Sequence, residues 1–132
     1  MPKLDISIHT QLSEIPKSDW DSLANPDGER FDPFLSWDFL EALESSGAAS
    51  PEEGWAPHHL LVRDEEGSAR AALPLYLKTH SYGEFVFDHA WADAYARVGG
   101  NYYPKLLSAI PFTPVTGRRL LYDRSVESAH LY

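Results

Sequence analysis

LPLYLKTHSYGEFVFDHAWADAYARVGGNYYPKLLSAIPFTPVTGRR, residues 73–119, mixes aromatic and ionisable side chains throughout its length. The aromatic members are Tyr76, Tyr82, Phe85, Phe87, Trp91, Tyr95, Tyr102, Tyr103 and Phe112, and the ionisable members beside them include Lys78, His80, Glu84, Asp88, His89 and Lys105. An ordinary surface carries fewer aromatic rings, and an ordinary core carries fewer charged groups. We therefore interpret this stretch as the wall of a ligand pocket.

Length and composition predict one small folded domain covering residues 1–132. A chain of 132 residues is long enough for one hydrophobic core and too short for two full domains. With 43% hydrophobic and 13% aromatic residues, the chain has a globular composition, which excludes global disorder.

Charge is distributed unevenly along the chain. Residues 1–66 hold 15 acids and 4 bases, whereas residues 67–132 hold 5 acids and 7 bases. No basic stripe with interleaved aromatic residues is present, so direct binding of nucleic acid by this chain is disfavoured. A bound anion remains compatible with the second half.

The chain has no cysteine, which excludes disulfides and thiolate chemistry. Its first ten residues lack the apolar run of a signal peptide, and no stretch approaches the ~20 apolar residues that span a bilayer. We expect a cytoplasmic protein without a membrane span.

Local patterns in residues 4–47 predict one strand followed by two helices. Leu4, Ile6 and Ile8 alternate with polar residues, as in a strand that buries one face. A first helix begins near Pro16, is anchored by Trp20 and Leu23, and stops at the turn of residues 25–28. A second helix has Ser36 as N-cap, an apolar face of Phe39, Leu40 and Leu43, and Gly47 as its stop.

The remaining residues predict strands and one short helix. We expect a loop over residues 48–57 in which Trp55 is buried, and a hairpin with strands at 60–62 and 69–77. Pro74 requires a bulge or an edge position in the second of these strands. A helix at 91–98 ends at Gly99 and Gly100, and a buried strand follows at 106–110. This order predicts an α/β (α+β) fold with helices packed on a mainly antiparallel sheet.

The order of elements and several motifs resemble the FemAB-like family within the GNAT acyltransferase superfamily. The similar segments are FLSWDFLEALESSG (34–47), GWAPHHLLV (54–62), PLYLKTHSYGEFVFDHAWADAY (74–95) and GGNYYPKLLSAIPFTPVTGRRLL (99–121). This resemblance implies a GNAT-like sheet and a role in peptidoglycan biosynthesis or recognition. It also implies transfer of an acyl or aminoacyl group from acyl-CoA or aminoacyl-tRNA to an amine.

A departure from the GNAT pattern affects the cofactor expectation. GNAT units hold the pyrophosphate of acyl-CoA on a glycine-rich turn that enters a helix. After Ile110 this chain has one glycine, Gly117, and no full helix. We therefore expect an incomplete, N-terminal half-GNAT portion with no cofactor of its own, inactive alone. We also expect an open sheet edge that favours a homodimer, and Arg118 and Arg119 near a lost anion site.

The candidate catalytic residues are Glu84, Asp88 and His89, because a carboxylate can orient an imidazole that accepts a proton near neutral pH. The candidate substrate-binding residues, which would shape the pocket of a small-molecule or cell-wall-precursor acceptor, are His80, Tyr82, Trp91, Tyr102, Tyr103 and Lys105.

Simpler interpretations remain open for these residues. Asp88 and its neighbours suit caps of the helix at 91–98, and dense aromatic residues suit a core. The spacing of His80, Glu84, Asp88 and His89 does not match a zinc site, so we expect no metal. His58 and His59 are expected to be structural, and Ser81 and Ser108 lack the context of a nucleophilic serine. The alternative function is a non-catalytic fragment that binds a ligand or a protein.

Overall fold

In a computed structural model, described for residues 3–81, 89–113 and 115–123, the chain forms two small antiparallel sheets with helices. The larger sheet has the order β1-β3-β4-β7, formed by β1 (Leu4–His9), β3 (His59–Asp64), β4 (Ala69–Leu73) and β7 (Leu121–Tyr122). The smaller sheet has the order β2-β5-β6, formed by β2 (Trp55–Pro57), β5 (Tyr76–Lys78) and β6 (Lys105–Leu107). The expected mixed α+β class is confirmed, and it is compatible with an incomplete GNAT-like fold.

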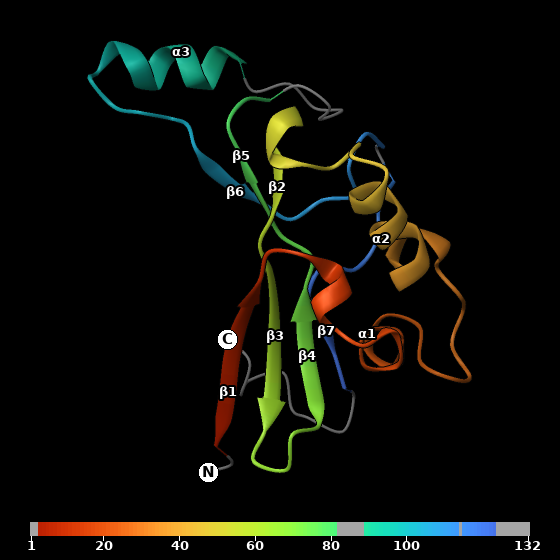
Figure 1. The fold of residues 1–132 in the computed structure, drawn as a ribbon. Coiled ribbons are helices and arrows are strands. Elements are labelled where there is room, and N and C mark those ends of the chain that lie inside the picture. Colours follow the sequence, from red (N-terminus) through yellow and green to blue (C-terminus); the bar gives the residue numbers. More distant parts are fainter. Residues whose placement is uncertain (1–2, 82–88, 114, 124–132) are drawn as a thin grey trace.

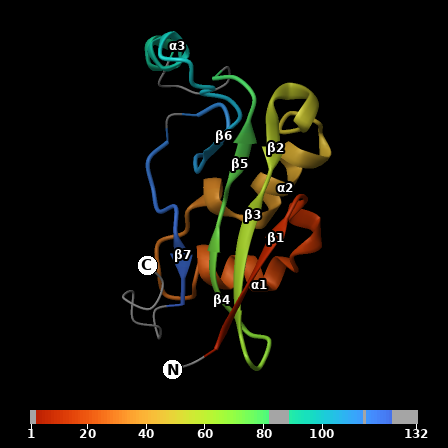
Figure 2. The same cartoon turned by 90° about the vertical axis from the view of Figure 1, so that its left-hand side faces the viewer.

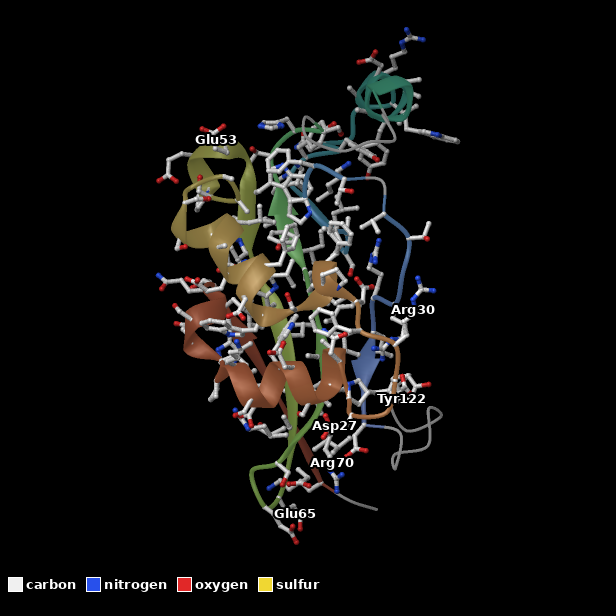
Figure 3. All side chains as sticks on the ribbon, turned by 90° about the vertical axis from the view of Figure 1, so that its right-hand side faces the viewer. Asp27, Arg30, Glu53, Glu65, Arg70 and Tyr122 are labelled. Atoms are coloured by element: carbon white, nitrogen blue, oxygen red, sulfur yellow. The ribbon has the colours of Figure 1, made fainter. Side chains whose placement is uncertain are left out.

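Two helices cover one face of the larger sheet. α1 (Lys17–Ala24) and α2 (Trp37–Ser45) lie on the same side of the strands (Figure 1). The short 3₁₀ turns η1 (Leu12–Glu14) and η2 (Pro33–Leu35) precede α1 and α2, and η3 (Pro51–Glu53) precedes β2. Figure 3 views the molecule from this helical side, with Glu53 near one end and Glu65 and Arg70 near the other.

Local sequence explains both covering helices. Trp20 and Leu23 of α1 are buried, and the indole of Trp20 donates a hydrogen bond to the Leu35 carbonyl at 2.9 Å. Ser36 caps α2 by accepting a hydrogen bond from the Phe39 amide. Leu40 is fully buried, so the predicted anchors and cap are confirmed.

The main core lies between these helices and the inner face of the larger sheet. It contains Leu12, Ile15, Trp20, Leu23, Ala24, Leu35, Leu40, Leu61, Ala72, Ile110 and Leu121. Leu61, Ala72 and Leu121 come from neighbouring strands of the sheet. Because paired residues of antiparallel strands share a face, these three side chains together line the helical side.

The expected strand at the start of the chain is confirmed, but its predicted buried face is wrong. Ile6 and Ile8 are 65% and 60% exposed, whereas Ser7 and His9 are partly buried. An alternation of period two shows that two faces differ, but it does not show which face the helices cover. Figure 2 shows β1, β3 and β4 in front of the two helices.

The predicted second strand of the hairpin divides between the two sheets. Residues 69–73 pair with β3, whereas Tyr76–Lys78 pairs with β2 and β6. Pro74 lies between the two strands, at the break that it was expected to cause. The expected loop at 48–57 is wrong at its end, because Trp55–Pro57 forms β2, although Trp55 is buried as predicted.

The last helix, α3 (His89–Arg97), confirms the helix expected at 91–98. It lies beyond the end of the smaller sheet, on the opposite side from α1 and α2 (Figure 1). The strand expected at 106–110 is shorter and earlier, at Lys105–Leu107. β6 ends at Leu107. The hydroxyl of the next residue, Ser108, donates a hydrogen bond to the Pro74 carbonyl at 2.7 Å.

Candidate functional site

The predicted catalytic residues fall largely outside the part of the chain that the structure describes. Glu84, Asp88 and the substrate-binding candidate Tyr82 lie within residues 82–88, which are not described. His89 is the first residue of α3, and only its backbone is described. The proposed catalytic group therefore stays a prediction.

Three of the predicted substrate-binding residues meet beside the pairing of β5 and β6. Lys105 begins β6 opposite Lys78, the last residue of β5. The Lys105 ammonium donates to the Ser81 hydroxyl at 3.1 Å, and Ser81 also forms a hydrogen bond with the hydroxyl of Tyr103. We call Ser81, Tyr102, Tyr103 and Lys105 the tyrosine–lysine cluster.

Aromatic rings surround the lysine of this cluster. The Lys105 ammonium lies 5.4 Å from the centroid of the Tyr102 ring and 5.7 Å from that of Tyr103. The rings of Tyr102 and Tyr103 pack edge to face with their centroids 5.0 Å apart. The ring of Tyr95 in α3 packs on that of Tyr102 with a centroid distance of 6.3 Å. Cation–π attraction and ring packing thus position hydroxyls and an ammonium group together.

Ser81 is the member of this cluster that the sequence did not assign to a site. Its side chain is fully buried, and both Tyr103 and Lys105 contact its hydroxyl. Its separation from these residues along the chain is 22 and 24 positions, so no local motif marks it. Its sequence context lacks the signature of a nucleophilic serine, and the hydroxyl links the tyrosine and the lysine.

His80 and Trp91, the other predicted substrate-binding residues, occupy different surroundings. The His80 imidazole lies against the backbone of Gly54, where the Nε2 atom would be 2.3 Å from an added Cβ. The Trp91 side chain on α3 is 74% exposed. Their roles in binding stay predictions.

A second group of polar side chains is buried between α2 and the sheets. His59 Nε2 lies 2.7 Å from Glu44 Oε2, and the Leu75 amide donates to His59 Nδ1 at 3.2 Å. Because Nδ1 accepts, the hydrogen-bond network assigns the ring proton to Nε2, which donates to the carboxylate. Glu44 Oε1 accepts from the Leu12 amide at 2.7 Å, so this pair joins η1, α2 and β3. The expected structural role of His59 agrees with these contacts.

Two buried polar atoms next to this pair have no hydrogen-bond partner in the described structure. They are the Tyr76 hydroxyl and the Trp55 indole nitrogen. The rings of these two residues pack edge to face with their centroids 5.2 Å apart. Burial, with a smaller contribution from the negative charge of Glu44, raises the pKa of Tyr76 far above its usual value, so the phenol stays protonated. The buried Lys78 ammonium lies 3.7 Å from the centre of the Trp55 ring.

A groove opens on the surface beside α2. It has a volume of about 570 Å³ and is lined by Thr10, Gln11, Ser13, Glu41, Glu44, Ser45, Ala49, Ser50, Pro51 and Pro57. Glu44 lies at this groove while holding His59, so it connects the groove to the buried pair. Sequence reasoning missed this groove because its walls come from four separate segments.

Comparison with known families adds the decisive observation. Residues 11–132 match the family model described as FemAB-like, peptidoglycan biosynthesis/recognition. The chain belongs to the FemAB-like family. Neither curated proteins nor solved structures give a match to this chain. In the described part of this FemAB-like chain, no helix is both long and apolar enough to cross a membrane.

Proposed function

We propose that this FemAB-like chain forms the acceptor side of an acyl- or aminoacyl-transferase that acts on a cell-wall precursor. Membership of a family concerned with peptidoglycan biosynthesis or recognition supports the general assignment. The observation that carries the finer assignment is the tyrosine–lysine cluster, in which Lys105 joins two tyrosine rings and Ser81.

The chemistry of this cluster suits a peptidoglycan precursor. Such a precursor combines sugar rings with carboxylate and phosphate groups and with a peptide that carries an amine on one side chain. Tyrosine rings present flat apolar faces to a sugar and hydroxyls to its polar groups, and a lysine attracts carboxylate or phosphate. Tyr102, Tyr103 and Lys105 therefore act as binding residues in this proposal, with His80 and Tyr82 as further parts of the acceptor wall.

The proposed reaction requires a base for the acceptor. The acceptor amine must lose a proton so that its nitrogen can attack the carbonyl carbon of a thioester or ester donor. A new C–N amide bond forms, the bond to the thiol or hydroxyl leaving group breaks, and that group takes a proton. We assign the base to the group of Glu84, Asp88 and His89, in which a carboxylate orients the imidazole.

The donor is assigned by class only. Acyl-CoA and aminoacyl-tRNA carry the required activated carbonyl, and both are found in the cytoplasm, so the proposal includes a cytoplasmic location. The proposal leaves donor binding to residues outside this chain, because residues 111–119 provide a single glycine for a phosphate-binding turn. Residues 1–132 alone are then expected to bind acceptor without catalysing transfer.

Calorimetric titration of the chain with a soluble muramoyl pentapeptide tests the acceptor assignment. Tyr102→Leu and Lys105→Ala are expected to weaken binding by at least about tenfold, the effect of losing one good contact. Lys17→Ala is the matched control, because Lys17 is an exposed lysine paired with Asp38 on the helical side. Equal affinities of all variants, or no binding by the unaltered chain, would overturn the acceptor assignment.

A transfer assay separates the transferase from a non-catalytic binding protein. Residues 1–132 and the chain extended by its natural coding sequence are compared with acyl-CoA, aminoacyl-tRNA and the same acceptor. Transfer by the extended chain, reduced in its Lys105→Ala variant, supports the proposal. Binding of the acceptor without transfer by either form supports the alternative, a ligand-binding module.

A further inference from the structure

The larger sheet has an apolar face that the helices do not cover. Ile6 pairs with Val62, and Ile8 pairs with Leu60, which in turn pairs with Leu73. Paired residues of antiparallel strands share a face, so these five side chains form one surface, which we call the open sheet face. Ile6 and Ile8 are mostly exposed on it, because α1 and α2 occupy the other side.

Helix α3 carries a second exposed apolar surface. Trp91, Tyr95 and Val98 follow each other at spacings of four and three residues, which places them on one side of the helix and its end. Trp91 and Val98 are 74% and 81% exposed, and Tyr95 is 49% exposed. We call these three residues the α3 stripe.

These two surfaces contain most of the large apolar groups that the described chain leaves in water. Five of its eight exposed large hydrophobic side chains belong to them, the others being Phe31, Leu106 and Phe112. Scattered apolar residues on a surface are ordinary, whereas grouped ones mark an interaction site. In a single copy Ile6, Ile8 and the α3 stripe are exposed, whereas Leu60, Val62 and Leu73 are partly buried.

We propose that two copies of the chain pair reciprocally, so that the α3 stripe of each covers the open sheet face of the other. A helix stripe packed on an apolar sheet face is the pairing from which mixed α/β layers are built. α3 lies on the opposite side of the molecule from α1 and α2, the side to which the open sheet face also turns (Figures 1 and 2). Each copy therefore offers both halves of the contact.

Each copy contributes both surfaces to the reciprocal pair. The exposed parts of Trp91 and Tyr95 come to roughly 250 Å² when an aromatic side chain covers about 150–250 Å². Val98, Ile6 and Ile8 add aliphatic surface, so the apolar centre suits a small interface in which a polar rim supplies the rest of the ~800 Å² per partner.

Charge favours this arrangement over pairing of two β1 edges. β1 and β3 belong to residues 1–66, whose 15 acids outnumber their 4 bases, whereas α3 belongs to residues 67–132, with 5 acids and 7 bases. In the reciprocal contact, α3, which carries one acid (Asp93) and one base (Arg97), meets strands from the acidic half, so the contact adds no excess of like charge. Edge pairing would instead bring two acidic halves together, at a cost in repulsion.

Sedimentation velocity over a range of concentrations tests the association. The unaltered chain is expected to form dimers. Two double variants, which change no charge, are each expected to weaken dimerisation at least about tenfold. The sheet variant combines Ile6→Thr with Ile8→Thr, and the helix variant combines Trp91→Gln with Val98→Gln. Threonine keeps the strand preference and glutamine the helix preference, so circular dichroism should be unchanged. Leu106→Thr, at a side chain 59% exposed on β6, is the matched control.

Mixing the two double variants distinguishes the reciprocal contact from other dimers. A mixed pair retains one intact contact, between the sheet face of the helix variant and the α3 stripe of the sheet variant. The mixture is therefore expected to associate more strongly than either variant alone. A helix variant that still dimerises fully would overturn the proposal in favour of edge pairing, and an unaltered chain that stays monomeric would overturn any dimer.

Site-directed cross-linking tests the contact itself, because the chain has no cysteine of its own. Chains that carry only Ile8→Cys are mixed with chains that carry only Trp91→Cys, and the mixture is treated with a short bismaleimide. Mixed cross-linked dimers in excess over either homodimer are expected. Efficient cross-linking within single chains that carry both substitutions, without dimers, would overturn the proposal by showing that α3 folds onto its own sheet.

Discussion

The His59 imidazole donates a 2.7 Å hydrogen bond to the Glu44 carboxylate in the interior of the protein. The His59 side chain is fully buried and that of Glu44 is 11% exposed, so water contributes little to either group. The carboxylate also accepts from the Leu12 amide, and the imidazole accepts from the Leu75 amide. Four separate segments are thus joined through two side chains.

Glu44→Leu should lower the free energy of unfolding by about 1–3 kcal/mol for each buried donor that it leaves without an acceptor. The substitution leaves the ring N–H of His59 and the Leu12 amide without their acceptor. Urea unfolding followed by circular dichroism measures the change. Glu41→Gln, at a carboxylate one turn earlier in α2, is the control and should change stability by less than about 0.5 kcal/mol. Equal stabilities of the two variants would contradict this account of the pair.

Tyr76→Phe should leave stability unchanged or raise it by about 1 kcal/mol, because it removes a buried hydroxyl that has no partner in the described structure. The matched comparison is Tyr103→Phe, which removes a hydroxyl that bonds Ser81 and should cost about 1 kcal/mol. Thermal unfolding of both variants measures the difference. A loss of stability in Tyr76→Phe as large as that in Tyr103→Phe would show that the Tyr76 hydroxyl is bonded, for example to a buried water molecule.

Local patterns predicted those parts of the fold whose causes are local. Trp20 at a helical spacing and Ser36 before the apolar face of α2 identified two helices, because anchors and caps act within a few residues. The side of β1 that is buried was predicted wrongly, because it depends on where α1 and α2 return across the sheet. Trp55 was expected to be buried, but its strand was missed, because three residues including a proline become a strand only by pairing with β5.

The candidate site shows the same division. The density of aromatic and charged groups in residues 73–119 pointed to Tyr102, Tyr103 and Lys105, which do lie together. The contacts of Ser81 and the pairing of Glu44 with His59 carried no signal, since the partners are 15 to 24 residues apart in the chain. Distances of that kind are fixed by sheet pairing and helix packing, which single-sequence patterns do not encode.

Asp64 should make the turn between β3 and β4 sensitive to acid. Hydrogen bonds from the Ser68 amide first, and then from the Arg70 guanidinium and the Glu66 amide, lower the pKa of Asp64. A lowered pKa contributes stability above the pKa of the unfolded state, about 3.9, and this contribution is lost as pH falls through the folded value. Asp64→Asn should therefore melt at a lower temperature than the unaltered chain at pH 7, and the difference should shrink as pH falls below about 4.

Glu65→Gln, in the same turn, is the control for the acid experiment. The Glu65 side chain is exposed at the tip of the turn (Figure 3). Its melting temperature should follow that of the unaltered chain from pH 7 to about pH 3. A difference between Asp64→Asn and the unaltered chain that persists undiminished to low pH would indicate that the substitution acts through packing rather than through charge.

Gly54→Ala should destabilise the protein through two separable effects. Gly54 has φ of +77°, and a Cβ there would lie 2.3 Å from Nε2 of His80. The left-handed backbone alone costs an alanine about 1–2 kcal/mol, and the contact with the imidazole adds to that cost.

Gly67→Ala isolates the backbone effect, because Gly67 has φ of +84° with no heavy atom within 4 Å of an added Cβ. Urea unfolding should rank Gly54→Ala as the less stable variant, and combining it with His80→Ala should bring its additional loss close to that of Gly67→Ala. If Gly54→Ala and Gly67→Ala lose equal stability, the imidazole moves aside at no cost and does not hold this loop in place.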